Sequence, residues 1–160
     1  MPKPIIERRR YERYETELEI VFHHKYKLQT KVSFRLIRPE SSGLKKYKGI
    51  TRDVSVEGLG FNSPKKLITG EILELELYLP EQKKPLRMNG EVRWSMLALS
   101  KKPEAYKYDT GVRLLTIGRK KVIDTVRFDK EYGVYWSAVL DSIFGNFKII
   151  AKKLRRKAAK

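Results

Sequence analysis

The sequence has no cysteine and only two histidines among its 160 residues. The lack of cysteine excludes a disulfide framework, a thiolate zinc site and a thiol nucleophile. No stretch of about 18 apolar residues occurs, so the sequence predicts no transmembrane helix. The first residues also contain no apolar run long enough for a signal peptide, and we therefore expect a cytoplasmic protein.

Motifs of catalysis are missing as well. The sequence contains no Gly-x-Ser-x-Gly elbow, no P-loop and no Gly-x-Gly-x-x-Gly fingerprint. His23 and His24 are neighbours, so on a strand they point to opposite faces and cannot form one metal site. Ser55 has no evident general base. The sequence therefore predicts a binding protein, not an enzyme, with neither a metal nor a cofactor.

Basic residues are in large excess. The chain has 36 Lys and Arg against 19 Asp and Glu, which gives a formal net charge of +17. Residues 146–160 include seven basic residues and no acid, and Arg8, Arg9, Arg10 and Arg13 form a second cluster. Phosphate is the natural partner of such clusters, in a nucleotide, a nucleic acid or a lipid headgroup. A solvated basic surface is the simpler interpretation of each cluster alone.

Alternating apolar residues predict β-strands in the middle of the chain. Leucine occupies every second position over residues 73–79, and a second strand over 86–96 has Val92 and Trp94 on the same face. Gly90 marks a bulge or sharp bend in that strand. Further strands are expected over residues 18–22, 50–54, 59–61 and 106–114. This spacing indicates a mainly β fold, an antiparallel barrel or sandwich, with residues 25–48 unassigned.

The C-terminal part of the chain predicts helices. A short helix is expected over about residues 118–130, and a longer one follows Gly133. Its apolar seam has heptad spacing and consists of Trp136, Leu140, Ile143, Phe147, Ile150 and Leu154. Gly145 favours a bend or break within it. Three fates of the seam stay open: packing on the domain's own barrel, self-association through residues 136–154, and binding to an anionic membrane.

Two short segments contain residue types suited to nucleotide binding. Arg9 and Arg13 form Arg-x-x-x-Arg, and arginine makes planar, bidentate contacts with phosphate or a guanine edge. In the segment Asp53-Val54-Ser55-Val56-Glu57-Gly58, the side chains of Asp53 and Ser55 share one face. There a carboxylate can accept hydrogen bonds from guanine, and a hydroxyl can donate or accept. Gly58 allows a left-handed turn or a close backbone approach.

Together, these segments resemble the two binding motifs of the PilZ domain family, whose members bind the bacterial second messenger cyclic di-GMP. The resemblance covers about residues 7–130 and extends to three further strand segments: 58–61, 90–94 and 108–114. It implies a six-stranded antiparallel β-barrel with a C-terminal helical extension. It also implies that cyclic di-GMP is bound by Arg8, Arg9, Arg13, Asp53, Ser55 and Gly58.

The resemblance also implies a domain organisation. Residues 1–14 form a ligand-binding arm, residues 15–132 a barrel domain, and residues 133–160 an amphipathic helix and a basic tail. The forty positions between Arg13 and Asp53 exceed the usual spacing in the family, so an insertion, as a hairpin or extended strands, is expected at about residues 25–48.

A switch without catalysis follows from this interpretation. The arginines of the arm repel one another, and the ligand would neutralise them and order the arm over the barrel, where an unidentified downstream protein could detect it. Arg8 supplies an extra cation where an apolar residue would cover the ligand, so two stacked cyclic di-GMP molecules per chain are expected.

Two alternative functions remain at this stage. The first is a basic β-barrel that binds single-stranded nucleic acid through Arg, Lys and aromatic residues such as Tyr11, Tyr14 and Tyr26. The second is a structural protein whose helix docks to a membrane or a partner and whose barrel has lost its ligand.

Overall fold

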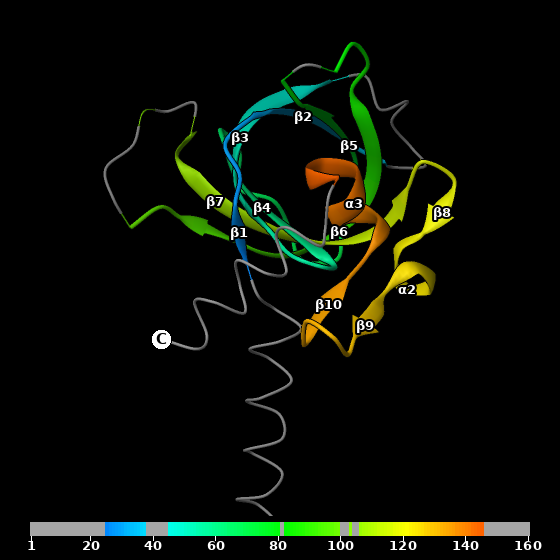
Figure 1. The fold of residues 1–160 in the computed structure, drawn as a ribbon. Helices are drawn as coiled ribbons and strands as arrows, with labels where there is room; N and C mark the ends of the chain where they lie inside the picture. Colours follow the sequence, from blue (N-terminus) through cyan, green and yellow to red (C-terminus); the bar gives the residue numbers. More distant parts are fainter. Residues whose placement is uncertain (1–24, 38–44, 81, 100–102, 104–105, 146–160) are drawn as a thin grey trace, which may run out of the picture.

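The computed structural model describes residues 25–37, 45–80, 82–99, 103 and 106–145. Their main feature is a closed antiparallel barrel of six strands in the order β3-β2-β5-β6-β7-β4, with β4 pairing back to β3 (Figure 1). The predicted mainly β fold is therefore confirmed. The barrel strands are β2 Lys31–Leu36, β3 Tyr47–Val54, β4 Gly58–Ser63, β5 Ile72–Tyr78, β6 Leu86–Leu97 and β7 Tyr108–Ile117. Two-residue strands extend the sheet, β1 Tyr26–Lys27 beside β3 and β8 Lys120–Lys121 beside β7.

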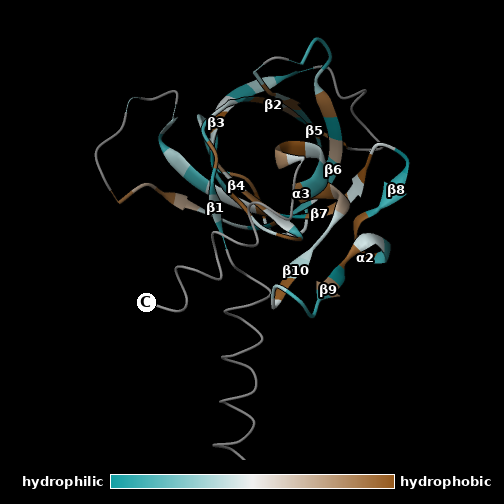
Figure 2. Cartoon of the chain, viewed as in Figure 1, coloured by the Kyte–Doolittle hydropathy of each residue, from teal (hydrophilic) through white to brown (hydrophobic). Residues whose placement is uncertain are grey.

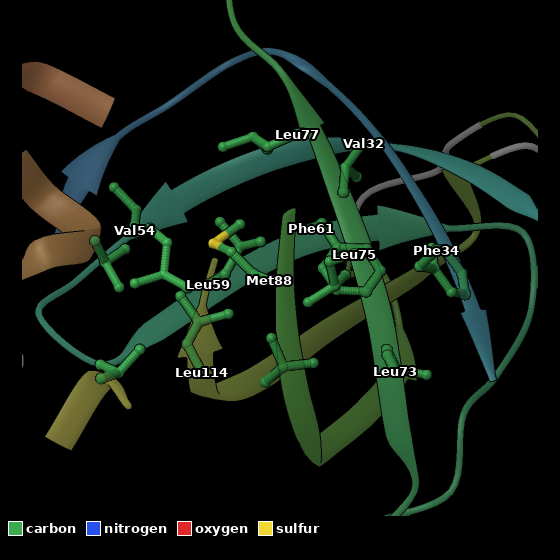
Figure 3. Packing of buried hydrophobic residues seen from close by; sticks show 14 of the residues in the cluster. Val32, Phe34, Val54, Leu59, Phe61, Leu73, Leu75, Leu77, Met88 and Leu114 are labelled. Carbon is green, nitrogen blue, oxygen red and sulfur yellow. The ribbon is translucent and has the colours of Figure 1, made fainter. Parts of the chain in front are cut away.

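The barrel interior is filled by the apolar residues of the alternating strands. Leu73, Leu75 and Leu77 of β5 are all completely buried, as the leucine alternation predicts. Figure 3 shows these side chains pointing inward to meet those of β2, β3, β4 and β6. Hydropathy changes from residue to residue along the strands, which places apolar side chains inside and polar ones outside (Figure 2).

The segment that the sequence left unassigned contains an integral barrel strand. Residues 31–36 form β2, which pairs with β3 on one side and with β5 on the other. Val32 and Phe34 are buried in the core. Val32, Phe34 and Leu36 alternate with polar residues over six positions only, and lysines and arginines surround this run, so the alternation is weak over residues 25–38 as a whole.

Two register shifts between β6 and β7 reverse the faces of these strands. The first lies between Asn89 and Gly90, but its extra residue is Leu115 of β7, so the bulge is on the strand opposite Gly90 and not at Gly90 itself, where the sequence predicts a bulge or sharp bend. The second lies between Val92 and Trp94 and was not expected. Val92 opposite Val112 is buried in the core, whereas Trp94 opposite Gly111 lies on the outer wall. The prediction that Val92 and Trp94 share a face is therefore wrong, because a bulge inserts one residue and inverts the alternation that follows.

The first predicted helix is much shorter than expected. Helix α2 Val122–Thr125 is a single turn, flanked by β8 and by β9 Arg127–Asp129. Only Val122 of this turn is buried. Of the apolar residues whose spacing predicts the helix, Val122 and Ile123 lie in α2 and Val126 lies beyond its end, where the chain continues into β9.

The predicted start of the long C-terminal helix is also wrong. Residues Val134–Trp136 form β10, which pairs with β9, and helix α3 Ala138–Phe144 begins only after Ser137. The helix ends at Gly145, whose φ of 74° is left-handed, so the break that the sequence allowed there is confirmed. The part of the seam formed by Phe147, Ile150 and Leu154 lies outside the described residues. None of the helices within the described ranges is long and apolar enough to span a membrane.

The C-terminal elements pack on the domain's own barrel. Figure 1 shows α3 over one opening of the barrel, and Trp136, Val139 and Leu140 are at most 1% exposed within the core cluster. The Ser137 hydroxyl donates a 2.7 Å hydrogen bond to the carbonyl of Val56. The Tyr26 ring of β1 packs edge-on against Trp136 and in a tilted arrangement against Phe144. The described residues of the seam, Trp136, Leu140 and Ile143, therefore pack on the domain's own barrel.

An ion pair between Lys46, which directly precedes β3, and Glu76 of β5 predicts a pH effect on stability: the glutamate side chain is 12% exposed and the lysine side chain 53%. The Lys46 ammonium donates a 2.8 Å hydrogen bond to Glu76, and this contact lowers the pKa of Glu76 against the opposing effect of burial. Because the folded-state pKa is lowered, the pair stabilises the fold above the unfolded-state pKa and loses this contribution as the pH falls through the folded-state value. We expect Lys46→Met to lower the free energy of unfolding at pH 7 and to lower it less at about pH 3, which lies below the ordinary glutamate pKa.

Urea denaturation at both pH values measures this difference. Lys48→Met is the matched control, since Lys48 is an exposed lysine of β3. An equal loss of stability in the Lys46 variant at both pH values would show that the ion pair is not the cause.

Candidate functional site

A cavity of about 430 Å³ lies on the outer wall of the barrel, over β3, β4, β6 and β7. It is lined by charged, polar and glycine residues, two aliphatic residues and one aromatic ring. The lining consists of Lys25, Asp53, Ser55, Glu57, Gly58, Leu59, Gly60, Arg93, Trp94, Gly111, Val112 and Arg113. The residues of the Asp-x-Ser-x-x-Gly motif are thus brought together at one end of a ligand-sized hollow.

The floor of the cavity is a row of residues across four strands. Asp53 pairs with Gly60, Gly60 pairs with Gly111, and Gly111 pairs with Trp94. A Cβ atom on Gly60 would lie 2.5 Å from Asp53 Oδ1, and one on Gly111 would lie 2.4 Å from the Trp94 indole. The two glycines are therefore needed for space: they let a carboxylate and an indole lie flat on the sheet from opposite sides.

The turn between β3 and β4 is fixed by two hydrogen bonds between its ends. The Ser55 N–H donates to the Gly58 carbonyl at 2.9 Å, and the Gly58 N–H donates to Ser55 Oγ at 3.1 Å. The Ser55 hydroxyl therefore keeps its own hydrogen for a further acceptor. Gly58 does not have a left-handed φ. Its role is the close approach, because a Cβ there would lie 3.0 Å from Ser55 Oγ.

The electrostatics of the cavity combine a cationic rim with two partnered acids. Lys25, Arg93 and Arg113 line it and are exposed. Glu57 lies 3.8 Å from Arg113, and Asp53 lies 3.6 Å from Arg52, which stands beside the cavity. Such a site favours an anion that also presents hydrogen-bond donors, since the rim attracts phosphate and the acids accept from N–H groups.

Three of the six residues predicted for the site are described by the structure. Asp53, Ser55 and Gly58 all line the cavity. The three arginines of the arm, Arg8, Arg9 and Arg13, lie outside the described residues. The prediction that they bind the same ligand therefore stays a prediction.

Several lining residues were missed at the level of sequence. The alternation over residues 86–96 predicts Trp94 in the core, and neither binding motif includes Gly60, Gly111, Arg93 or Arg113. Glycines in the interior of two strands were the available signal, because they mark a close approach to the backbone. Trp94 could not be found in this way, since only the bulge after Val92 turns it outward.

The fold and the cavity together define a class: a small closed antiparallel β-barrel with a cation-rimmed binding cavity on its outer wall. A family model described as the PilZ domain matches residues 7–123. The chain belongs to the PilZ domain family, whose members are generally receptors for cyclic di-GMP. The resemblance inferred from the motifs is thereby confirmed.

Other comparisons add little beyond the family. No curated protein matches the sequence. Among solved structures, the chain is similar to the PilZ domain of CeSA from a cellulose-synthesizing bacterium, at 14% identity and a TM-score of 0.43 over 76% of this chain and 96% of that one. It is also similar to the Bacillus subtilis inhibitor of motility, MotI/DgrA, at 17% identity and a TM-score of 0.42 over 59% of this chain. The match spans 42% of that longer protein.

Proposed function

We propose that this protein is a non-enzymatic receptor for cyclic di-GMP that binds through Arg9, Arg13, Asp53, Ser55 and Gly58. The observation that supports it best is the common location of Asp53, Ser55 and Gly58 in one cavity of a PilZ-family barrel. These three residues belong to one short motif, which begins forty positions after Arg13, and the fold places that motif beside residues of β6 and β7 in the same cavity.

The chemistry of the cavity suits a guanine dinucleotide. Guanine offers N–H donors on its Watson–Crick edge, which the Asp53 carboxylate can accept, and an acceptor edge that a guanidinium can contact. The Ser55 hydroxyl can donate to a phosphate or a carbonyl oxygen. Trp94 offers an aromatic face at the far end of the floor, and stacking of a base on such a ring is favourable. Arg9 and Arg13 are assigned to the phosphates or to the guanine acceptor edge.

Ordering of the arm is the proposed signal. The ligand neutralises the clustered arginines and folds residues 1–14 over the cavity, so that a downstream protein meets a different surface. A second path for the signal leads to α3. The Val56 carbonyl, in the turn that carries the binding motif, accepts a hydrogen bond from Ser137, the residue before this helix. Neither route requires bond making or breaking in the ligand.

Calorimetric titration of the full chain with cyclic di-GMP tests this function. We expect saturable binding, and we expect the linear dinucleotide and GTP to bind much more weakly. The expected stoichiometry is two ligands per chain, since Arg8 can balance the charge of a second, stacked molecule. Arg8→Leu should then reduce the ratio to one. A ratio of one in both proteins would contradict the stacked pair, and no binding at all would overturn the receptor.

The same titration at several salt concentrations distinguishes the receptor from a single-strand binder, the function that the net charge of +17 would also suit. Binding of single strands weakens with a logarithmic slope of about 0.7 per phosphate contacted. A cyclic dinucleotide offers two phosphates and should show a shallow slope. A steep slope with an oligonucleotide, together with no response to cyclic di-GMP, would favour the nucleic-acid binder.

A further inference from the structure

Arg52 occupies a special place beside the cavity because it is the extra residue of a β-bulge. In the pairing of β3 with β4, Thr51 lies opposite Phe61 and Asp53 lies opposite Gly60, so Arg52 has no partner residue across the ladder. In a regular strand, two neighbouring residues point to opposite faces. The bulge removes this restriction and lets the guanidinium reach the carboxylate of the next residue, a common use of bulges near binding sites.

The guanidinium of Arg52 joins two carboxylates. Its Nη1 lies 2.9 Å from Asp109 Oδ2, and its Nη2 lies 3.6 Å from Asp53 Oδ2. The side chains of Arg52, Asp53 and Asp109 are only 31%, 22% and 19% exposed, so the network is better shielded than an ordinary surface pair. The Asn62 side-chain amide donates to the other oxygen of Asp109. Asp109 is therefore held at both oxygens and acts as a fixed anchor for Arg52.

The network lies to one side of the candidate binding cavity. Arg52 and Asn62 line a neighbouring cavity, which they share with Lys25 and Asp53, and do not line the cavity that contains Trp94. Asp53 lines both. Its Oδ2 faces Arg52, while its Oδ1 is the atom that lies nearest to Gly60 on the floor. Arg52 thus reaches the first cavity only through the Asp53 carboxylate.

We propose that Arg52 is a positioning residue: anchored by Asp109 and Asn62, it holds the Asp53 carboxylate in the orientation that accepts hydrogen bonds from a guanine base. This inference rests on the proposed function for its ligand and on the bulge network for its geometry. With a carboxylate on either side, Arg52 does not serve as a phosphate-binding cation.

The first part of the test uses the free protein and needs no ligand. Three-bond couplings from the Asp53 Cγ to its backbone nitrogen and carbonyl carbon report whether its χ1 angle adopts one rotamer. We expect a single rotamer in the wild type and averaged couplings in Arg52→Gln. The matched control is Arg35→Gln, which breaks the 2.8 Å pair of Arg35 with Glu74 elsewhere on the barrel. Unchanged couplings in Arg52→Gln would overturn the positioning role.

The second part measures binding of cyclic di-GMP by calorimetry. Arg52→Gln should weaken binding about tenfold, as expected for the loss of one charge-assisted interaction. Arg35→Gln should bind like the wild type, and Arg52→Lys, which keeps the charge, should recover part of the loss. In an Asp53→Asn background, Arg52→Gln should cause no further loss. Additive losses would show that Arg52 contacts the ligand directly and would overturn the inference.

The two parts separate this inference from the proposed function. If the wild type does not bind cyclic di-GMP, the receptor is overturned, and the Asp53 couplings still decide whether Arg52 positions that carboxylate. If the wild type binds and Arg52→Gln binds equally well, only the role of Arg52 is overturned. The Lys variant keeps both parts informative if Arg52→Gln is too unstable to study.

Discussion

Arg13→Ala is expected to weaken cyclic di-GMP binding by roughly ten- to a hundredfold. A hydrogen bond to a charged partner contributes about 1.5–3 kcal/mol, and each 1.4 kcal/mol is about a factor of ten in affinity. Arg9→Ala should have an effect of similar size, because both guanidinium groups are assigned to the same anionic ligand. Asp53→Ala and Ser55→Ala should each cost less but remain measurable. Isothermal titration of the purified full-length variants provides the affinities.

The control for the arm is an arginine that lies away from both cavities. Arg119 is exposed in the turn between β7 and β8 and lines neither cavity. Arg119→Ala should bind like the wild type and removes the same formal charge, so it corrects for the general loss of attraction. If Arg13→Ala binds as tightly as Arg119→Ala, the Arg-x-x-x-Arg motif has been assigned wrongly.

Trp136→Ala is expected to lower the free energy of unfolding by about 3–5 kcal/mol, the usual cost of truncating a large aromatic core residue. The Trp136 side chain is completely buried, and Tyr26 packs against its ring. Its indole also donates to Asp141 at the first turn of α3, so the variant loses an anchor of the helix as well. Chemical denaturation of the full chain measures this loss.

Phe128→Ala is the matched control for this prediction. Phe128 belongs to β9 of the same hairpin but is 47% exposed, so its removal should change stability far less than that of Trp136. A small effect for Trp136→Ala would mean that the C-terminal elements are not part of the core. Self-association through the seam would then return as the explanation of its apolar residues.

The barrel could be predicted because its strands alternate with period two. Leu73, Leu75 and Leu77 alternate with glutamates, and a half-buried strand is the only regular element that fits this pattern. The strand over 31–36 was not predicted, because its alternation is short and lies within a segment rich in lysine and arginine, although Val32 and Phe34 are buried. The long C-terminal helix was predicted to begin too early. A heptad spacing gives the positions of side chains only where the backbone is helical, and Trp136, the first residue of the seam, lies on a strand.

Part of the candidate site could be predicted for a different reason. Asp53, Ser55 and Gly58 lie within six consecutive residues, so a single turn determines their relative positions, and the turn is closed by hydrogen bonds among these same residues. Trp94 and Gly111 lie far away in sequence. Their place in the cavity depends on the register of β6 with β7, which local pattern does not report.

The sequence by itself determined the strand alternation, the binding turn and the family, because each of these depends on short-range spacing. Only the tertiary structure decided which residues face the cavity. The bulge at Arg52 turns its guanidinium toward Asp53, and the bulge after Val92 turns Trp94 out of the core. A bulge forms where the closure and twist of the whole barrel require an extra residue in one strand, so its position is a property of paired strands and not of either strand alone.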